Sequence, residues 1–306
     1  MARKGHEAGA WFPRWFWPSF SAPGTLWLLL FFVLPFYVIL SVAFGGLDQI
    51  FLTATPVYDP LRWSFGPFHS VVTSLLTHQS IAQETFVRTL VYVAIATAMS
   101  LVIGYPVAYF IARHAGRAKT FFLVAFFAPF WISYMMRMFS WVNLLQPDGY
   151  VNRVLQALGI LHEPRLWLDG KPSTVIFGLV YGYVPYMILP LYGVLDRIDR
   201  GTLEAARDLG AGQTRTFLRV TLPLSRQAIL AGCIIVALPM FGDYFTETLL
   251  ASTRQTAMFG NLIVSSMDSS LVNQGASLVI VMVAILLIPM VYYLRSTNVA
   301  RELAER

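Results

Sequence analysis

Residues 203–225 read LEAARDLGAGQTRTFLRVTLPLS. Thr202 can cap a helix that begins at Leu203, because its hydroxyl can accept a hydrogen bond from a backbone N–H of the first turn. Gly210 can end that helix in the left-handed conformation, which costs glycine little. A second helix is predicted from Gln213 and is expected to stop before Pro223. The segment therefore predicts a helix–turn–helix whose first helix, of about two turns, is too short to cross a membrane. Two of its leucines, Leu203 and Leu209, are expected to stay partly exposed unless a partner covers them.

Long apolar segments dominate the rest of the chain. Hydrophobic residues make up 57% of the 306 residues and charged residues only 12%, which is too little charge for the surface of a soluble domain. A membrane-spanning helix needs about 20 mostly apolar residues. We expect helices rather than barrel strands, because no alternating pattern is present. The six predicted spans are roughly Leu26–Gly45, Thr89–Ala112, Thr120–Leu145, Thr174–Leu195, Ala228–Leu250 and Ala276–Leu294.

The distribution of Lys and Arg predicts that both termini are cytoplasmic. Basic residues are concentrated at the N-terminus, between the second and third spans, in the connection 196–227 and in the C-terminal tail. The connections on the other side are longer and carry fewer basic residues for their length. The net charge of +6 arises mainly from this asymmetry and requires no nucleic-acid partner. The first span is longer than the apolar core of a signal peptide, about 7–15 residues, so we expect it to be retained.

The expected domain organisation is a single membrane domain between two tails. Residues 1–23 form a cytoplasmic tail with an interfacial elbow, residues 24–295 the six-helix domain, and residues 296–306 a cytoplasmic C-terminal tail. The elbow is expected over residues 11–20, WFPRWFWPSF, because Trp, Phe and Arg interrupted by Pro suit the headgroup layer. Short helices are expected in the outer connections 46–86, 146–173 and 251–274.

The helix–turn–helix segment resembles the EAA loop in the permeases of bacterial binding-protein-dependent ABC importers. The family pattern is E-A-A, three residues, Gly, nine residues and I-x-L-P, with Val in place of Ile here. The resemblance implies the type I ABC importer (MetI-like) permease fold, an all-α integral membrane fold with six transmembrane helices. It also implies that this loop is the cytoplasmic coupling helix that docks onto an ATPase. The matching residues are Glu204, Ala205, Ala206, Gly210, Val220, Leu222 and Pro223.

The same resemblance implies the partners and the location. The chain is expected in the bacterial cytoplasmic (inner) membrane with two copies of an ATP-binding subunit and a second permease subunit, which is a different chain in most polyamine systems. A periplasmic or lipid-anchored substrate-binding protein is expected to dock on the outer connections. The sequence has no G-x-x-x-x-G-K-[ST] phosphate-binding loop, so ATP and Mg are assigned to the partner ATPase. No cofactor and no enzymatic activity are expected in this chain.

Residues 129–141, PFWISYMMRMFSW, resemble the P-F-W-T-S-x-x-I-R-x-Y-A-W pattern of spermidine/putrescine permeases. This chain differs from the pattern at four residues, Ile132, Met136, Phe139 and Ser140. Asp148, Gly149 and Asn152 follow in the next connection. This second resemblance implies a polyamine as the transported solute. The residues that match are Pro129, Phe130, Trp131, Ser133, Arg137 and Trp141.

Ionisable residues inside the apolar runs are candidates for the transport path, because such groups are costly in lipid and usually face a bundle interior or water. Asp243 and Glu247 are predicted on one face of the fifth span, about 6 Å apart along its axis. With Tyr244 they could bind a polycation by ion pairing and cation–π contact. Arg137 and Trp131 are further candidates for the path. Two alternatives remain open: Arg137 pairs with Asp243 or Glu247 to hold two helices together, or Glu247 lies in water at the interface.

Other functions are also compatible with parts of the sequence. The importer could carry iron, sulfate, thiosulfate, phosphonate or an opine-like compound, although an anion path should be lined by basic groups. A membrane enzyme would need convergent nucleophile, base or metal groups. The five histidines lie outside the apolar runs without ligand spacing, and G-x-S-x-G and H-E-x-x-H motifs are absent, so no metal site is expected. A channel or secondary transporter would work without an ATPase and would leave the coupling motif unexplained.

Overall fold

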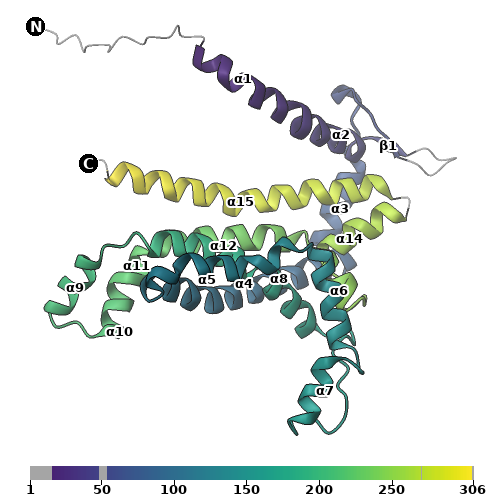
Figure 1. Cartoon of the computed structure of the whole chain (residues 1–306). Coiled ribbons are helices and arrows are strands. Elements are labelled where there is room, and N and C mark those ends of the chain that lie inside the picture. The colour runs from purple at the N-terminus through teal and green to yellow at the C-terminus, as the bar shows by residue number, and fades with distance from the viewer. Residues whose placement is uncertain (1–15, 48–53, 270, 305–306) are drawn as a thin grey trace, which may run out of the picture.

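The computed structural model describes residues 16–47, 54–269 and 271–304, most of which are helical (Figure 1). Within these ranges four helical segments are long and apolar enough to cross a membrane on their own. They are Ser19–Ala43, α4 (Ile81–Arg113), α8 (Pro172–Leu195) and the part Val272–Ser296 of α15 (Val272–Ala304). Two bent pairs, Gly116–Trp131 with Tyr134–Leu145 and Gln213–Leu224 with Arg226–Phe241, raise the number to six if each pair is one span. The all-α membrane architecture predicted from the sequence is confirmed.

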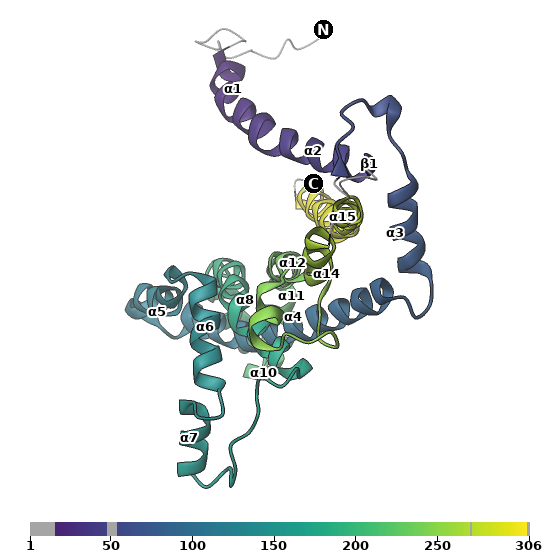
Figure 2. The ribbon, with the colours of Figure 1, turned by 90° about the vertical axis from the view of Figure 1, so that its right-hand side faces the viewer.

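The first span consists of α1 (Phe16–Leu28), a π-helical turn (Leu29–Val33) and α2 (Leu34–Ala43). Residues 11–15 of the predicted elbow lie outside the described residues, as do the first 10 residues of the predicted tail, and residues 16–20 belong to α1. The end of α2 is tied to α15, because the Nδ2 of Asn273 donates to the carbonyls of Gly45 and Gly46 at 3.1 and 3.0 Å. Figure 2 shows that α1 stands apart from the central helices.

The connections at the end of the bundle opposite α9 (Arg200–Asp208) and α10 (Gln213–Thr216) contain short helices, as predicted. They are α3 (Gly66–Leu76), α7 (Tyr150–Ala157) and α14 (Phe259–Asp268). A small antiparallel pair, β1 (Gly46–Leu47) with β2 (Ala54–Thr55), and a 3-10 turn (Pro60–Arg62) were not predicted. We call this side of the bundle the α14 end and the other side the α9 end (Figure 1).

The prediction of one continuous helix over Thr120–Leu145 is wrong. The segment comprises a 3-10 turn (Gly116–Ala118), α5 (Lys119–Phe127), a second 3-10 turn (Ala128–Trp131) and α6 (Tyr134–Leu145), with a bend of 85°. Proline lacks the N–H that a helix interior needs, so Pro129 interrupts the series of backbone hydrogen bonds at that point. Ile132 and Ser133 are extended, with ψ of 138° and 139°, and α6 starts in a new direction.

The predicted fifth span, Ala228–Leu250, is also divided. It comprises α12 (Arg226–Phe241) and α13 (Phe245–Leu250), separated by residues 242–244. Pro239 removes one hydrogen bond near the end of α12, and glycine at 242 is a poor helix former. The Oδ1 of Asp243 accepts the backbone N–H of Thr246 at 3.0 Å, which satisfies a donor in the first turn of α13. Asp243 therefore lies at a helix break and not on the face of a continuous helix.

The core lies where α4, α8 and α12 cross. Met187 of α8 is fully buried, and its side chain lies against Gly104 of α4 and Gly232 of α12. A Cβ at Gly232 would lie 2.7 Å from the Sδ of Met187, so the small residues allow the helices to approach closely. Many apolar side chains outside this core remain exposed, including those of residues 26–34, as expected for surfaces that face lipid or a partner chain.

Candidate functional site

The helix–turn–helix segment lies at the α9 end, where α15 also ends (Figure 1). Its first helix, α9 (Arg200–Asp208), begins three residues before the predicted start, and the residue at its N-cap is Asp199 instead of Thr202. The predicted start followed from Thr202 as a capping residue, whereas the backbone is extended at Asp199 and already helical from Arg200. Gly210 has φ of +83°, so the predicted left-handed end of the helix is confirmed. The tip that follows α9 therefore requires glycine for its backbone conformation.

The second helix of this segment does not stop before Pro223 as predicted. It runs through α10 (Gln213–Thr216), a π-helical turn (Phe217–Thr221) and α11 (Leu222–Leu224). Pro223, which has no N–H to donate, directly follows this π-helical turn, in which the backbone N–H of Leu222 binds the carbonyl of Phe217 five residues back. The break comes at Ser225, after which α12 leaves at 62°.

The segment has a buried face and an exposed face. Leu203, predicted to be partly exposed, is only 9% exposed, so that prediction is wrong; it is one of the residues that line a cavity of about 340 Å³, together with Tyr109 and Phe217. Leu209 is 89% exposed, in agreement with the prediction. Of the matched motif residues, Glu204, Ala205, Gly210 and Pro223 are exposed and Ala206, Val220 and Leu222 are half-buried.

Several contacts fix this segment to α4. The hydroxyls of Tyr105 and Ser225 are hydrogen-bonded at 2.9 Å, and the Nη2 of Arg113 donates to the carbonyl of Ile198 at 2.9 Å. The ring of Phe217 packs edge-on against Tyr105, with ring centroids 5.7 Å apart. These contacts attach the segment to the bundle.

A network of hydroxyl groups surrounds Asp243, which is 7% exposed. Its Oδ2 accepts hydrogen bonds from Thr246 Oγ1 at 2.6 Å, Tyr134 Oη at 2.9 Å and Tyr183 Oη at 3.2 Å. Tyr134 Oη and Thr246 Oγ1 also lie within hydrogen-bond distance of each other, so their two protons are divided between this contact and their contacts with Asp243. Tyr134 comes from α6, Tyr183 from α8 and Thr246 from α13, so the carboxylate joins three helices.

Tyr134, Tyr183 and Thr246 were not among the site residues predicted from the sequence. The presence of tyrosines inside the apolar runs could have indicated a polar site, because a buried tyrosine hydroxyl must find a hydrogen-bond partner. The sequence could not show which partner these hydroxyls find, since Tyr134 and Asp243 are 109 residues apart.

Glu247 contacts the connection between α13 and α14 and takes no part in the hydroxyl network around Asp243. It is 4% exposed, and its Oε1 accepts the backbone N–H of Thr253 at 3.1 Å and the hydroxyl of Thr256 at 2.9 Å. These bonds fold the connection between α13 and α14 back onto α13. The alternative that Glu247 lies in water is wrong, and the expected joint face with Asp243 is not present.

Arg137 forms neither of the ion pairs considered from the sequence. In the described part of the chain no carboxylate oxygen lies within 4.0 Å of its guanidinium. The guanidinium carbon instead lies 4.1 Å from the ring centroid of Phe130 and 5.5 Å from that of Tyr134. Its Nε and Nη1 are buried without a hydrogen-bond partner among the described residues. A cation–π contact thus joins α6 to the 3-10 turn that precedes the bend.

The other two path candidates lie near these groups without joining the network. Trp131 is 80% exposed at the bend between α5 and α6. Tyr244 is half-buried, its ring lies 4.0 Å from that of Phe245, and its carbonyl accepts Asn261 Nδ2 at 3.1 Å. Asp243 is therefore the candidate path residue that the structure surrounds with groups from several helices.

Gly182 makes room for this network, since a Cβ there would lie 2.6 Å from the ring of Tyr134. We expect Gly182→Ala to push Tyr134 away from Asp243 and to lower the stability of the protein by about 1–3 kcal/mol through overpacking. The measurement is thermal unfolding of the purified protein in detergent. Gly193→Ala, on the same helix and with nothing within 4 Å, is the control and should change stability by less than about 1 kcal/mol. Equal melting temperatures for the two variants would contradict the close packing.

The connection after α6 is organised around Asn152, which is fully buried. The two N–H groups of its Nδ2 are shared among the carbonyls of Gln146, Pro147 and Arg165, which lie at 3.0–3.1 Å. Its Oδ1 accepts the backbone N–H of Arg165 at 3.1 Å and the indole N–H of Trp167 at 2.9 Å. One amide thus closes the segment between α6 and α8.

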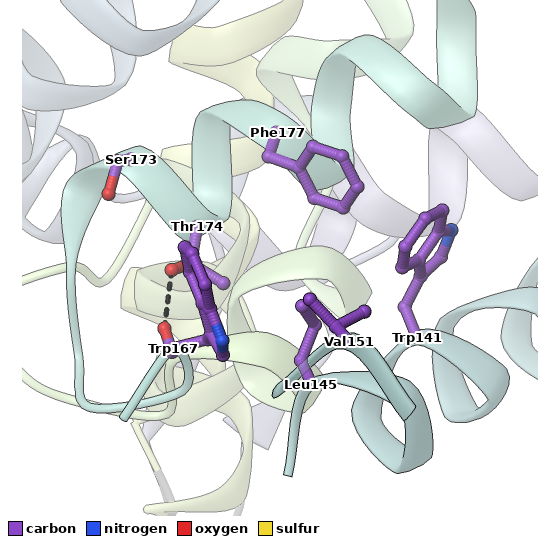
Figure 3. A pocket seen from close by; sticks show the side chains of 7 residues that line it. All are labelled: Trp141, Leu145, Val151, Trp167, Ser173, Thr174 and Phe177. Atoms are coloured by element: carbon purple, nitrogen blue, oxygen red, sulfur yellow. Dashed lines mark hydrogen bonds between the residues drawn. The ribbon is translucent and has the colours of Figure 1, made fainter. Parts of the chain in front are cut away.

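An apolar pocket of about 300 Å³ lies beside this segment (Figure 3). Trp141 and Phe177 pack edge-on with ring centroids 4.7 Å apart, and Thr174 Oγ1 donates to the carbonyl of Trp167 at 2.6 Å. The pocket shares Trp141 with the stretch that resembles spermidine/putrescine permeases. Its lining residues are Trp141, Leu145, Val151, Trp167, Ser173, Thr174 and Phe177.

Comparison with known proteins agrees with this architecture. Residues 15–299 match the family described as "Binding-protein-dependent transport system inner membrane component". The chain is 33% identical over 238 residues to the spermidine/putrescine transport system permease protein PotB of Escherichia coli K12, covering 78% of this chain and 81% of that protein. It is 33% identical over 240 residues to PotB of Haemophilus influenzae, with 78% and 79% covered. The inner membrane ABC transporter permease protein YdcU of Escherichia coli K12 is 30% identical over 251 residues, with 77% of each chain covered.

Solved structures show the same fold at lower identity. A bacterial ABC transporter involved in the import of the acidic polysaccharide alginate aligns with a TM-score of 0.66 over 94% of this chain and 96% of that chain, at 17% identity. The bacterial alginate ABC transporter in complex with an alginate pentasaccharide-bound periplasmic protein aligns with a TM-score of 0.67 over 91% and 92%, at 18% identity. The chain belongs to the family of binding-protein-dependent transport system inner membrane components, and it is an ABC importer permease subunit similar to the spermidine/putrescine permease PotB.

Proposed function

We propose that the chain forms part of the path for a polyamine such as spermidine or putrescine, with Asp243 as a carboxylate that the cation meets. The observation that carries this proposal is the burial of Asp243 at the break between α12 and α13 without a cation within 4.0 Å in the described residues. A carboxylate inside a membrane bundle is costly unless it serves a pathway or a partner. The similarity to PotB points to a polyamine as that cation.

The proposal includes the partners that the resemblance implies. Two copies of an ATP-binding subunit dock below, one of them on α9, and a second permease, a different chain, completes the path. A periplasmic or lipid-anchored binding protein docks at the α14 end. With α9 in the cytoplasm, α15 also ends on the cytoplasmic side (Figure 1). ATP and Mg act on the ATPase, and this chain performs no covalent chemistry.

The geometry supports a mechanical link between the ATPase site and Asp243. The helix α12 has 16 residues, or about 24 Å, and follows the α9–α11 segment after the bend at Ser225. Its other end is adjacent to Asp243. Closure of the ATPase dimer would move α9, α12 would carry that movement to the break at residues 242–244, and the path would open on the other side by a rigid-body change.

We expect cells that express the whole importer to accumulate labelled spermidine, and Asp243→Asn to lower that uptake at least tenfold. The substitution keeps the shape of the side chain and removes the charge that would attract the cation. Asp59→Asn is the matched control, because Asp59 lies in an exposed connection where it pairs with Arg62. Membrane levels are measured for each variant.

Two results would contradict this proposal in different ways. If the wild-type importer is assembled and its ATPase is active but no polyamine accumulates, the cargo is wrong, and the same cells are screened with anions and metal ions. If spermidine accumulates equally in wild type and Asp243→Asn, the cargo is right and Asp243 has no role in the path.

A further inference from the structure

The three hydroxyl groups that contact Asp243 differ in how firmly their own surroundings fix them in place. Thr246 donates to Oδ2 at 2.6 Å from the adjacent turn of α13, and its backbone N–H binds Oδ1. Tyr134 is fixed by close packing against Gly182, and its hydroxyl can also bond to Thr246 Oγ1 in place of Asp243. Tyr183 has the longest contact with Oδ2, at 3.2 Å, and its hydroxyl makes no second bond in the described residues. Of the three hydroxyls, that of Tyr183 can therefore move away from Asp243 with the smallest loss of hydrogen bonding.

The arrangement around Tyr183 is also suited to an incoming cation. Three neutral hydroxyls share one carboxylate oxygen, whereas an ammonium group would add the opposite charge that a buried carboxylate favours. The ring of Tyr183 lies 6.0 Å from that of Tyr134 and 6.3 Å from that of Tyr186, which is 46% exposed. Aromatic faces attract ammonium groups, so a displaced Tyr183 would still lie near the cation.

We propose that Tyr183 is a specificity-determining residue whose hydroxyl occupies Asp243 in the absence of cargo and is displaced by an ammonium group of the polyamine. The exchange breaks the hydrogen bond from Tyr183 Oη to Asp243 Oδ2 and forms one from the ammonium N–H to the same oxygen, with no proton transferred. A cargo that lacks a cationic amine cannot make this exchange. The inference rests on the polyamine path proposed above.

The test is equilibrium binding of labelled spermidine to the purified complex of both permeases and the ATPase, without the binding protein. Tyr183→Phe removes the competing hydroxyl and keeps the ring, so the dissociation constant for spermidine should fall about three- to tenfold, as expected for the loss of one competing hydrogen bond. Tyr186→Phe is the matched control on the same helix and should leave the constant unchanged, since its hydroxyl does not bond to Asp243.

A dissociation constant that rises in Tyr183→Phe would show that the hydroxyl helps to bind the cation, and an unchanged constant would show that it does not compete; either overturns the inference. Spermidine uptake by cells that depends on Asp243, together with no spermidine binding to the purified complex, also overturns it and leaves the proposed function intact. If wild-type cells take up no spermidine at all, the proposed cargo fails first, and this inference fails with it.

Discussion

Leu209→Glu is expected to abolish co-purification of the ATPase with the permease and, with it, ATP-driven uptake. Leu209 is 89% exposed at the end of α9, next to the left-handed Gly210. Burying a leucine side chain in a partner's groove stabilises a complex by about 1.5–3 kcal/mol. A carboxylate at the same place would lose that gain and add the cost of burying a charge. Because the side chain is almost fully exposed in the described chain, the permease itself should fold normally.

The control for this experiment is Leu61→Glu, which makes the same change at a residue that is 95% exposed in the connection between β2 and α3. It should leave ATPase binding at the wild-type level. Both variants are purified through a tag on the permease, and the bound ATPase is quantified. Normal ATPase binding to Leu209→Glu would show that α9 is not the docking helix, whatever the sequence of the loop resembles.

Asn152→Ala is expected to unfold the segment between α6 and α8 and to prevent stimulation of the importer by its binding protein. The substitution removes every hydrogen bond of a fully buried amide and leaves three carbonyls, the backbone N–H of Arg165 and the indole N–H of Trp167 without this partner. A typical intramolecular hydrogen bond contributes about 0.5–1.5 kcal/mol, so the local free energy of unfolding should fall by about 3 kcal/mol. Amide hydrogen exchange over residues 146–171 measures this local stability.

Asn143→Ala is the matched control, because Asn143 is exposed on α6 and donates only to the carbonyl of Phe139 in its own helix, at 2.9 Å. It should leave both hydrogen exchange and stimulation unchanged. Protection of residues 146–171 in Asn152→Ala equal to that in wild type would show that other contacts, such as the packing around Trp141, hold the segment in place. Normal stimulation despite rapid exchange would show that the binding protein docks elsewhere at the α14 end.

The sequence by itself determined the parts of this protein that depend on local pattern. Apolar runs of sufficient length can only be membrane helices, because lipid offers no hydrogen-bond partner to an open backbone. The left-handed end of α9 was predictable from Gly210, since glycine alone adopts that conformation at little cost. The family followed from the same segment, and the match over residues 15–299 confirmed it.

Only the tertiary structure decided what the polar groups inside the membrane contact. Hydropathy reports how apolar a segment is on average, so it could not show the 85° bend before α6 or the break at Asp243. It also could not show that Arg137 lies over Phe130 instead of beside an acid. The partners of Asp243 on α6 and α8 are 109 and 60 residues away, and they meet it because Gly182 lets Tyr134 approach. Such contacts depend on how whole helices cross, which no local pattern in the chain encodes.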